Sequence, residues 1–170
     1  MRAVYEDKNM FPILCGRSVM PETLVCRMGG GPILDNGYNP ITGALDINLK
    51  DHSRIILKPS LDSCSGYGVM LFEKEESSWV SVSDGCQLTI EFLLSYGDDF
   101  VVQEAIAQHP DISRFNPSSL NTLRIAVYRS VKDNVPYAVA SVIRICKEGM
   151  LSIMPMLEGY LQELILRQAS

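Results

Sequence analysis

Lys58 and the small-residue loop that follows it form the first candidate site. The loop at 60–69 reads SLDSCSGYGV. Backbone N–H groups of such a loop can point at anionic oxygens, glycine permits close approach, and a lysine adds a point charge. The pattern therefore indicates a polyphosphate site, although it lacks the GK[ST] ending of a P-loop and a strand follows it instead of a helix. The alternative is a glycine-rich hairpin turn with a surface lysine.

The stretch VVQEAI at 101–106 is the second candidate site. A buried strand that opens into a loop can offer a backbone N–H and a carbonyl to the edge of an adenine ring. Glu104 can accept hydrogen bonds from ribose hydroxyls. The alternative is a core strand that carries one exposed acid.

The stretch NTLRIAVYR at 121–129 is the third candidate site. Strand alternation places Arg124 on one face with the small residues Thr122 and Ala126, and Asn121 on the other face. A guanidinium among small neighbours can reach a phosphate or a carboxylate as a bidentate fork. The alternative is an exposed arginine on a half-solvated strand.

The histidines and cysteines form no metal-binding or nucleophile signature. His109 precedes Pro110 in a polar loop, where we expect a surface or hydrogen-bonding role, and His52 is not placed to pair with it. The five cysteines include no CxxC pair, and the N-terminus has no apolar secretory stretch. We therefore expect free thiols in the reducing cytoplasm.

Hydrophobic patterning predicts the elements that would position these residues. Strands are predicted at 23–27, 54–58, 69–72, 79–82, 100–106, 121–130 and 136–145. Hairpins are expected around the glycine-rich bend at 29–31, at 69–82 with a charged tip, and at 121–145. Helices are predicted at 41–50, at 86–95 with Leu88, Phe92 and Leu93 inward, and at 158–168 in the tail. This order favours an α+β protein with mostly antiparallel sheets.

Composition excludes several classes of protein but names no activity. The 170 residues are 46% hydrophobic, which is enough for a real core. The net charge of −5 argues against non-specific nucleic-acid binding, which needs a basic face. No run approaches the ~18 apolar residues of a transmembrane helix.

Taken in chain order, these stretches resemble the ATP-grasp superfamily, and in particular its sugar-transfer-associated branch, which is related to alpha-L-glutamate ligases. The resemblance spans residues 4–149. Its matching stretches are YEDKNMF, RIILKPSLDSCSGYGV and FVVQEAIAQHPDISRFNPSSLNTLRIAVYR, followed by the next hairpin. QEAIAQHP and NTLRI are the specific parts.

The resemblance implies two small α+β subdomains around a nucleotide cleft: a central subdomain at 1–100 and the hinge and start of a C-terminal subdomain at 101–151. It also implies ATP and Mg²⁺ as cofactors, and an activity that converts a carboxylate to an acyl phosphate for attack by an amine. The residues implied for the nucleotide are Lys58, Ser65, Gly66, Gly68, Gln103, Glu104, Ala105 and Ile106. Those implied to face the phosphates and the acyl substrate are Asn121 and Arg124.

The tail at 152–170 departs from this family. A VDN-like segment whose Asp and Asn would ligate Mg²⁺ is expected after the last hairpin, yet no Asp follows Asp133 and no Asn follows Asn134. A family-like VDNAYAGGISAG peptide, written in codons with its first G deleted, reads SIMPMLEGYLQ, which matches Ser152 onward. We therefore hypothesise a single-nucleotide frameshift after Leu151; the alternative is a genuinely divergent C-terminus.

The sequence thus predicts an ATP-binding protein with an incomplete C-terminal half, and weak or absent ligase turnover. The carboxylate and amine substrates are not identifiable from it. Two alternatives remain open: a noncatalytic nucleotide-binding or interaction module, and an unrelated α+β protein.

Overall fold

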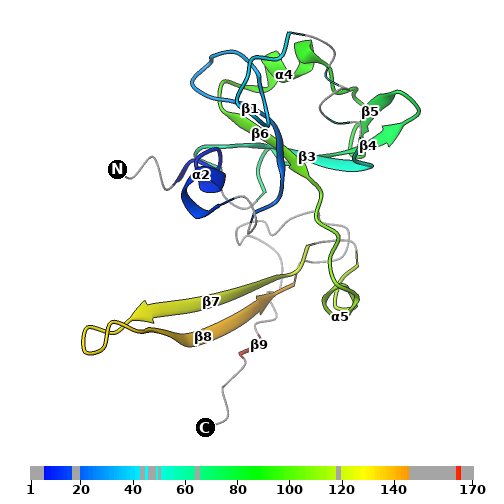
Figure 1. Cartoon of the computed structure of the whole chain (residues 1–170). Coiled ribbons are helices and arrows are strands. Elements are labelled where there is room, and N and C mark those ends of the chain that lie inside the picture. The colour runs from blue at the N-terminus through cyan, green and yellow to red at the C-terminus, as the bar shows by residue number, and fades with distance from the viewer. Residues whose placement is uncertain are drawn as a thin grey trace. The chain divides into compact units, whose positions relative to one another are not determined.

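The structure is a computed structural model of the whole chain (Figure 1). It describes residues 6–16, 20–42, 45, 49, 51–63, 66–117 and 120–145, and the backbone of 164–165. The chain divides into two compact units, Met1–Ile106 and Ala107–Ser170. Each unit is described by itself.

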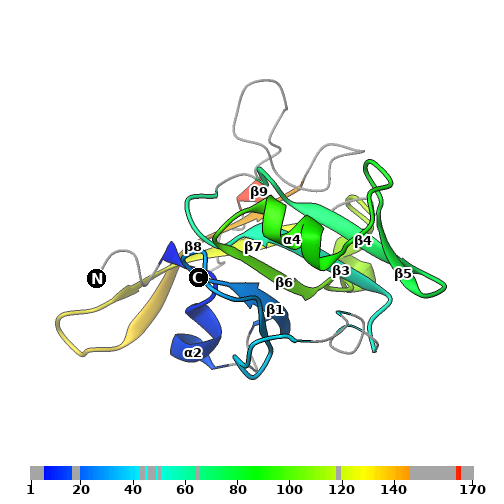
Figure 2. The same cartoon turned by 90° about the horizontal axis from the view of Figure 1, so that it is seen from above.

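The first unit is built on a six-stranded sheet with the order β2-β1-β6-β3-β4-β5. Its strands are β1 (Thr23–Arg27), β2 (Leu34–Asp35), β3 (Arg54–Pro59), β4 (Met70–Glu75), β5 (Ser78–Ser81) and β6 (Phe100–Glu104). All neighbouring strands pair antiparallel. β6, the last of these strands in the chain, lies between β1 and β3 (Figure 2). The predicted strands of this unit and the expected antiparallel α+β class are confirmed.

The two faces of the central strands have different surroundings. Ile55 and Leu57 on β3, and Phe100 and Val102 on β6, are fully buried in one hydrophobic cluster. Side chains from β1, β4, β5 and α4 (Ile90–Tyr96) complete this cluster. Since side chains alternate along a strand, Lys58 belongs to the opposite face of β3.

Helix α4 starts later than the helix predicted at 86–95. Thr89 is its N-cap, and the Thr89 hydroxyl accepts a hydrogen bond from a first-turn N–H at 3.1 Å. The residues before Thr89 run beside β5, where the Leu88 N–H donates to a β5 carbonyl at 2.9 Å. Of the side chains predicted to face inward, Leu88 and Leu93 are buried and Phe92 packs at the margin of the cluster.

Arg27 holds the glycine-rich bend between β1 and β2. Its guanidinium donates to the carbonyls of Gly31 at 2.9 Å, Gly97 at 2.9 Å and Gly30 at 3.1 Å. Gly29 and Gly30 adopt positive φ angles of 56° and 68°, which glycine reaches without strain. The predicted hairpin around this bend is confirmed, since β1 pairs with β2.

The hairpin of β4 and β5 also matches its prediction. Its strands continue into the charged run and leave a short turn, in which Glu76 has a φ of +52°. Trp79 on the same hairpin is only 1% exposed, and Lys74 lies over its ring at 5.9 Å from the centroid.

The described part of the second unit forms a three-stranded sheet with the order β7-β8-β9 and one short helix. Its elements are α5 (Pro110–Ser113), β7 (Thr122–Arg129), β8 (Pro136–Arg144) and β9 (Leu164–Ile165). The hairpin predicted at 121–145 is confirmed by the pairing of β7 with β8. The helix predicted at 158–168 is wrong at residues 164–165, which form β9 and pair with β8.

Other predictions fall wholly or partly outside the described residues. These are most of the 41–50 helix, the phosphate-loop residues Cys64 and Ser65, and the atypical tail except for the two residues of β9. Of the 41–50 apolar stripe, Leu45 and Leu49 are described, and both are buried. No helix in the described ranges has the length and apolarity needed to cross a membrane.

Candidate functional site

Lys58 lies at the end of β3 on the face turned away from the hydrophobic cluster. Its side chain is half-buried, and no described residue accepts a hydrogen bond from its Nζ. Burial lowers the pKa of Lys58, and the nearby charge of Lys8 lowers it further. Lys58 is therefore a partly desolvated cation without a counterion among the described residues.

Lys8 is a residue that the sequence interpretation left without a role. Its N–H donates to the Ser60 carbonyl at 3.0 Å, and its Nζ donates to Ser63 Oγ at 2.7 Å. Burial lowers the pKa of Lys8, while the charges of Asp7 and Asp62 raise it to a lesser extent. The available signal was the YEDKNMF stretch, which contains this lysine, but only the fold brings it to the end of β3.

The loop after β3 contains two glycines in the left-handed backbone region. Gly66 and Gly68 adopt φ angles of +80° and +72°. The Tyr96 hydroxyl donates to the Gly68 carbonyl, and a Cβ on Gly68 would lie 3.0 Å from a Pro59 side-chain atom. The backbone conformation therefore favours glycine at both positions, and at Gly68 a Cβ would also crowd the Pro59 ring. Ser65, predicted to bind phosphate, lies outside the described residues.

Ser60 opens this loop and is fully buried. Its hydroxyl oxygen has no hydrogen-bond partner among the described residues. A buried hydroxyl without a partner costs about 1–3 kcal/mol. A polar ligand or a water at this end of β3 would remove that cost.

The 103–106 stretch is only partly available to a ligand. Gln103 is 3% exposed, and its Nε2 donates to Thr23 Oγ1 at 3.1 Å. The Glu104 N–H donates to the Glu22 carbonyl at 3.0 Å, and the Ala105 N–H donates to a β3 carbonyl at 3.2 Å. The Ile106 N–H has no acceptor among the described residues, so this backbone donor is unpaired there.

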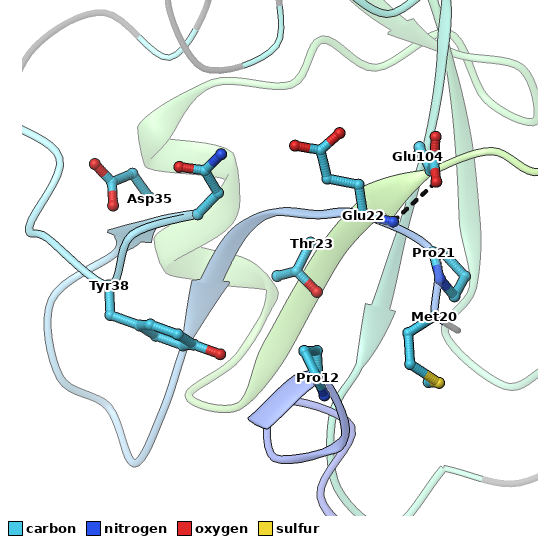
Figure 3. Close-up of a pocket in the computed structure, with 9 residues that line it drawn as sticks. Pro12, Met20, Pro21, Glu22, Thr23, Asp35, Tyr38 and Glu104 are labelled. Carbon is cyan, nitrogen blue, oxygen red and sulfur yellow. Dashed lines mark hydrogen bonds between the residues drawn. The ribbon is translucent and has the colours of Figure 1, made fainter. Parts of the chain in front are cut away.

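Glu104 also lines a cavity of about 440 Å³ beside β1 (Figure 3). One oxygen of its carboxylate, Oε1, accepts a hydrogen bond from the Glu22 N–H at 2.9 Å. Figure 3 shows this bond at one side of the cavity, with Tyr38 on the other side. The lining residues are Pro12, Met20, Pro21, Glu22, Thr23, Asp35, Asn36, Tyr38 and Glu104. Most of them belong to no sequence motif.

In the second unit, Asn121 and Arg124 have different environments. Asn121 is 5% exposed, and its Nδ2 donates to Gln108 Oε1 at 2.9 Å, to the Asn116 carbonyl at 3.0 Å and to the Ile112 carbonyl at 3.1 Å. These bonds tie α5 and its flanking loop to the start of β7. Arg124 is exposed on β7 opposite a β8 residue. Its guanidinium is accessible, whereas the Asn121 amide is used inside the unit.

His109 has the hydrogen-bonding role expected of it, and three of the five cysteines lie among the described residues. His109 Nδ1 accepts a hydrogen bond from the Asp111 N–H at 3.3 Å and caps α5. Cys15, Cys26 and Cys86 are free thiols. Among the described residues, no group of His, Cys, Asp and Glu side chains is arranged to hold a metal ion.

Comparison with known proteins adds no assignment to these sites. Neither a family model, nor a curated protein, nor a solved structure matches the chain. The function has to be argued from the residues described above.

Proposed function

We propose that the chain binds ATP as an ATP-grasp-like protein, with the triphosphate held at the end of β3. The observation that carries this proposal is the pair of partly buried lysines, Lys8 and Lys58, beside the positive-φ glycines of the loop. Two like charges in a poorly solvated place repel one another. A polyphosphate would neutralise both lysine charges, so its binding would relieve their mutual repulsion.

The base would lie along β3 toward the end of β6, with the Ile106 N–H as its backbone donor. Glu104 keeps its proposed contact with the ribose through the carboxylate oxygen that does not accept the Glu22 N–H. Gln103 is assigned a supporting role, since its amide is bonded to β1. Ser60 Oγ, which is buried and has no hydrogen-bond partner among the described residues, is a further candidate contact at the phosphate end.

The ligase activity is proposed only in an impaired form. We propose that Arg124 contacts the acyl phosphate, because the ATP-grasp resemblance implies this role and its side chain is exposed. Mg²⁺ in nucleotide sites is usually held by one or two carboxylates together with the phosphates. In the sequence no Asp follows Asp133 and no Asn follows Asn134, so the segment expected to supply these ligands is missing. We therefore propose slow turnover for this chain.

Isothermal titration calorimetry with ATP tests the binding proposal. We expect Lys58→Ala and Lys8→Met each to weaken ATP binding by about tenfold or more, because each removes a charge-assisted contact. AMP binding should change far less, since AMP lacks the outer phosphates. Lys132→Ala is the matched control, because Lys132 is an exposed lysine in the turn between β7 and β8. Equal effects of all three substitutions, or no ATP binding by the unmodified chain, would contradict the proposal.

The second candidate function is a noncatalytic nucleotide-binding or interaction module. It is favoured by the apolar side chains that the β7–β8 hairpin exposes, including Ile125 at 52% and Val139 at 61%. Phosphate release measured with ATP, Mg²⁺ and pooled acids and amines separates the two. Release that Arg124→Ala abolishes supports the ligase; tight ATP binding without release supports the module. We also propose a cytoplasmic location, which the free thiols support.

A further inference from the structure

The cavity beside β1 shares Glu104 with the nucleotide proposal, and its other lining residues form a binding site that this proposal does not use. Its volume of about 440 Å³ lies in the range of small-molecule pockets. The described lining residues all belong to the first unit. One wall is apolar and consists of Pro12, Met20 and Pro21; Figure 3 shows Thr23 between this wall and Tyr38.

The polar lining of the cavity is dominated by hydrogen-bond acceptors and negative charge. Glu22, Asp35 and Glu104 contribute carboxylates, Thr23 contributes a hydroxyl, and no lysine or arginine is among the described lining residues. His52 Nε2 lies 3.9 Å from Glu22 Oε2, so this carboxylate has an ionic partner only when His52 is protonated. Carboxylates only accept hydrogen bonds when ionised. Such a lining favours a ligand that brings donors and positive charge, and disfavours phosphates and carboxylates.

The geometry favours an organic cation over a metal ion. The three carboxylates do not gather into a group that could hold a metal ion. Asp35 Oδ1 already accepts hydrogen bonds from the N–H groups of Gly37 at 2.8 Å and Asn39 at 2.9 Å. The Tyr38 ring offers an aromatic surface, which attracts ammonium groups, and the proline wall offers contact for methylene groups.

We propose that this cavity binds a small primary amine with a short aliphatic body. Its ammonium group donates to the Glu22 carboxylate and lies between that carboxylate and the Tyr38 ring. Glu104, a second carboxylate of the cavity lining, adds negative charge. Its Oε1 accepts the hydrogen bond from the Glu22 N–H and so holds the Glu22 backbone in place. The aliphatic body packs on the wall of Pro12 and Pro21.

A titration with n-butylammonium, followed by two-dimensional NMR of the backbone amides, tests this proposal. The neutral n-butanol is the matched probe, because it has the same length without the charge. We expect saturable shifts at the Thr23 and Tyr38 amides with the amine at millimolar concentrations, and binding by the alcohol weaker by about tenfold. Equal binding of both probes, or no saturable shift with the amine, overturns the proposal.

Substitutions that remove a carboxylate charge but keep the side-chain shape test which carboxylates bind the ammonium group. Glu22→Gln and Glu104→Gln are each expected to weaken amine binding by about fivefold, and the glutamine at 104 still accepts the Glu22 N–H. Tyr38→Leu should weaken it by about threefold through the lost aromatic face. Glu76→Gln, in the exposed β4–β5 turn, is the matched control and should have no effect. An unchanged affinity in Glu22→Gln with an intact fold overturns the assignment.

The titration contains no nucleotide, so its result is independent of the ATP proposal. Amine binding should persist in Lys58→Ala, which is the variant expected to lose ATP. ATP binding without amine binding would therefore overturn only the cavity assignment, and the reverse result would overturn only the nucleotide assignment.

Discussion

The sheet of the first unit and the hairpin of the second have similar alternating sequences but bury their apolar side chains to opposite extents. Ile55 and Leu57 on β3 are 0% exposed, whereas Leu123 and Ile125 on β7 are 54% and 52% exposed. The first sheet has a second layer that includes α4, and the hydrophobic cluster forms between them. Alternation therefore predicts a strand, but burial depends on whether another element covers one face.

The largest expected effect is on the core of the first unit. Phe72→Ala should lower the free energy of unfolding by about 3–5 kcal/mol, because it leaves a cavity at a fully buried site. Ile125→Ala on the exposed hairpin should change it by less than about 0.5 kcal/mol. Urea unfolding followed by the fluorescence of Trp79, the single tryptophan, measures the first effect. Circular dichroism measures the unfolding of the second unit. Similar decreases in the free energy of unfolding for both variants would contradict the contrast between the units.

The second prediction compares two arginines that bond to backbone carbonyls. Arg27→Met should destabilise the first unit by about 2 kcal/mol, since the carbonyls of the glycine bend lose a charged donor. Arg129→Met should cost less than about 0.5 kcal/mol, because the bond of Arg129 to the Asn134 carbonyl is long, at 3.3 Å, and exposed. Thermal unfolding of both variants gives the comparison. Equal shifts would show that the bend does not depend on Arg27.

The third prediction concerns the polar network that organises the second unit. Asn121→Ala should cost about 1–2 kcal/mol locally, because the carbonyls of Ile112 and Asn116 lose their donor. Amide hydrogen exchange around α5 should become faster, while exchange in β3 and β6 stays unchanged. If Asn121 instead contacts only a substrate, α5 exchange will not respond to the substitution.

The smallest expected effect is a pH dependence from the lysine pair. Burial and the mutual repulsion of the two charges lower the pKa of Lys58 below its ordinary value of 10.5, so near that range the folded chain binds fewer protons than the unfolded chain. Stability should therefore rise as the pH rises from the lowered pKa toward 10.5. Lys8→Met should raise the pKa of Lys58 and flatten this rise. NMR titration of the lysine Nζ-coupled signals measures both; a pKa of Lys58 that Lys8→Met leaves unchanged would contradict the pairing.

Local patterns predicted most of the secondary structure for a local reason. Alternating apolar residues at 54–58 and 121–130 indicate strands because the side-chain period is a property of the backbone itself. The start of α4 was predicted too early, since residues 86–88 are held beside β5 by hydrogen bonds that no local pattern reveals. The tail helix was predicted from spacing alone, and β9 is decided by pairing with β8.

The candidate site divides in the same way. Residue types alone identified Lys58 as a candidate phosphate ligand and Gly66 and Gly68 as residues of a conformationally demanding loop. Lys8, whose charge influences Lys58, donates a hydrogen bond to the Ser60 carbonyl. Lys8 precedes Ser60 by 52 residues in the chain. No spacing rule relates residues that far apart.

The amino-acid sequence by itself determined the α+β class, the strands with their alternating faces, and the glycine-dependent loop, because each depends on short-range sterics and side-chain period. Only the tertiary structure decided which lysine charges influence one another, which backbone donors lack an acceptor among the described residues, and where the acidic cavity forms. Those features arise when antiparallel pairing brings β1, β3 and β6 side by side. Long-range pairing of this kind is set by the whole core and not by any one segment.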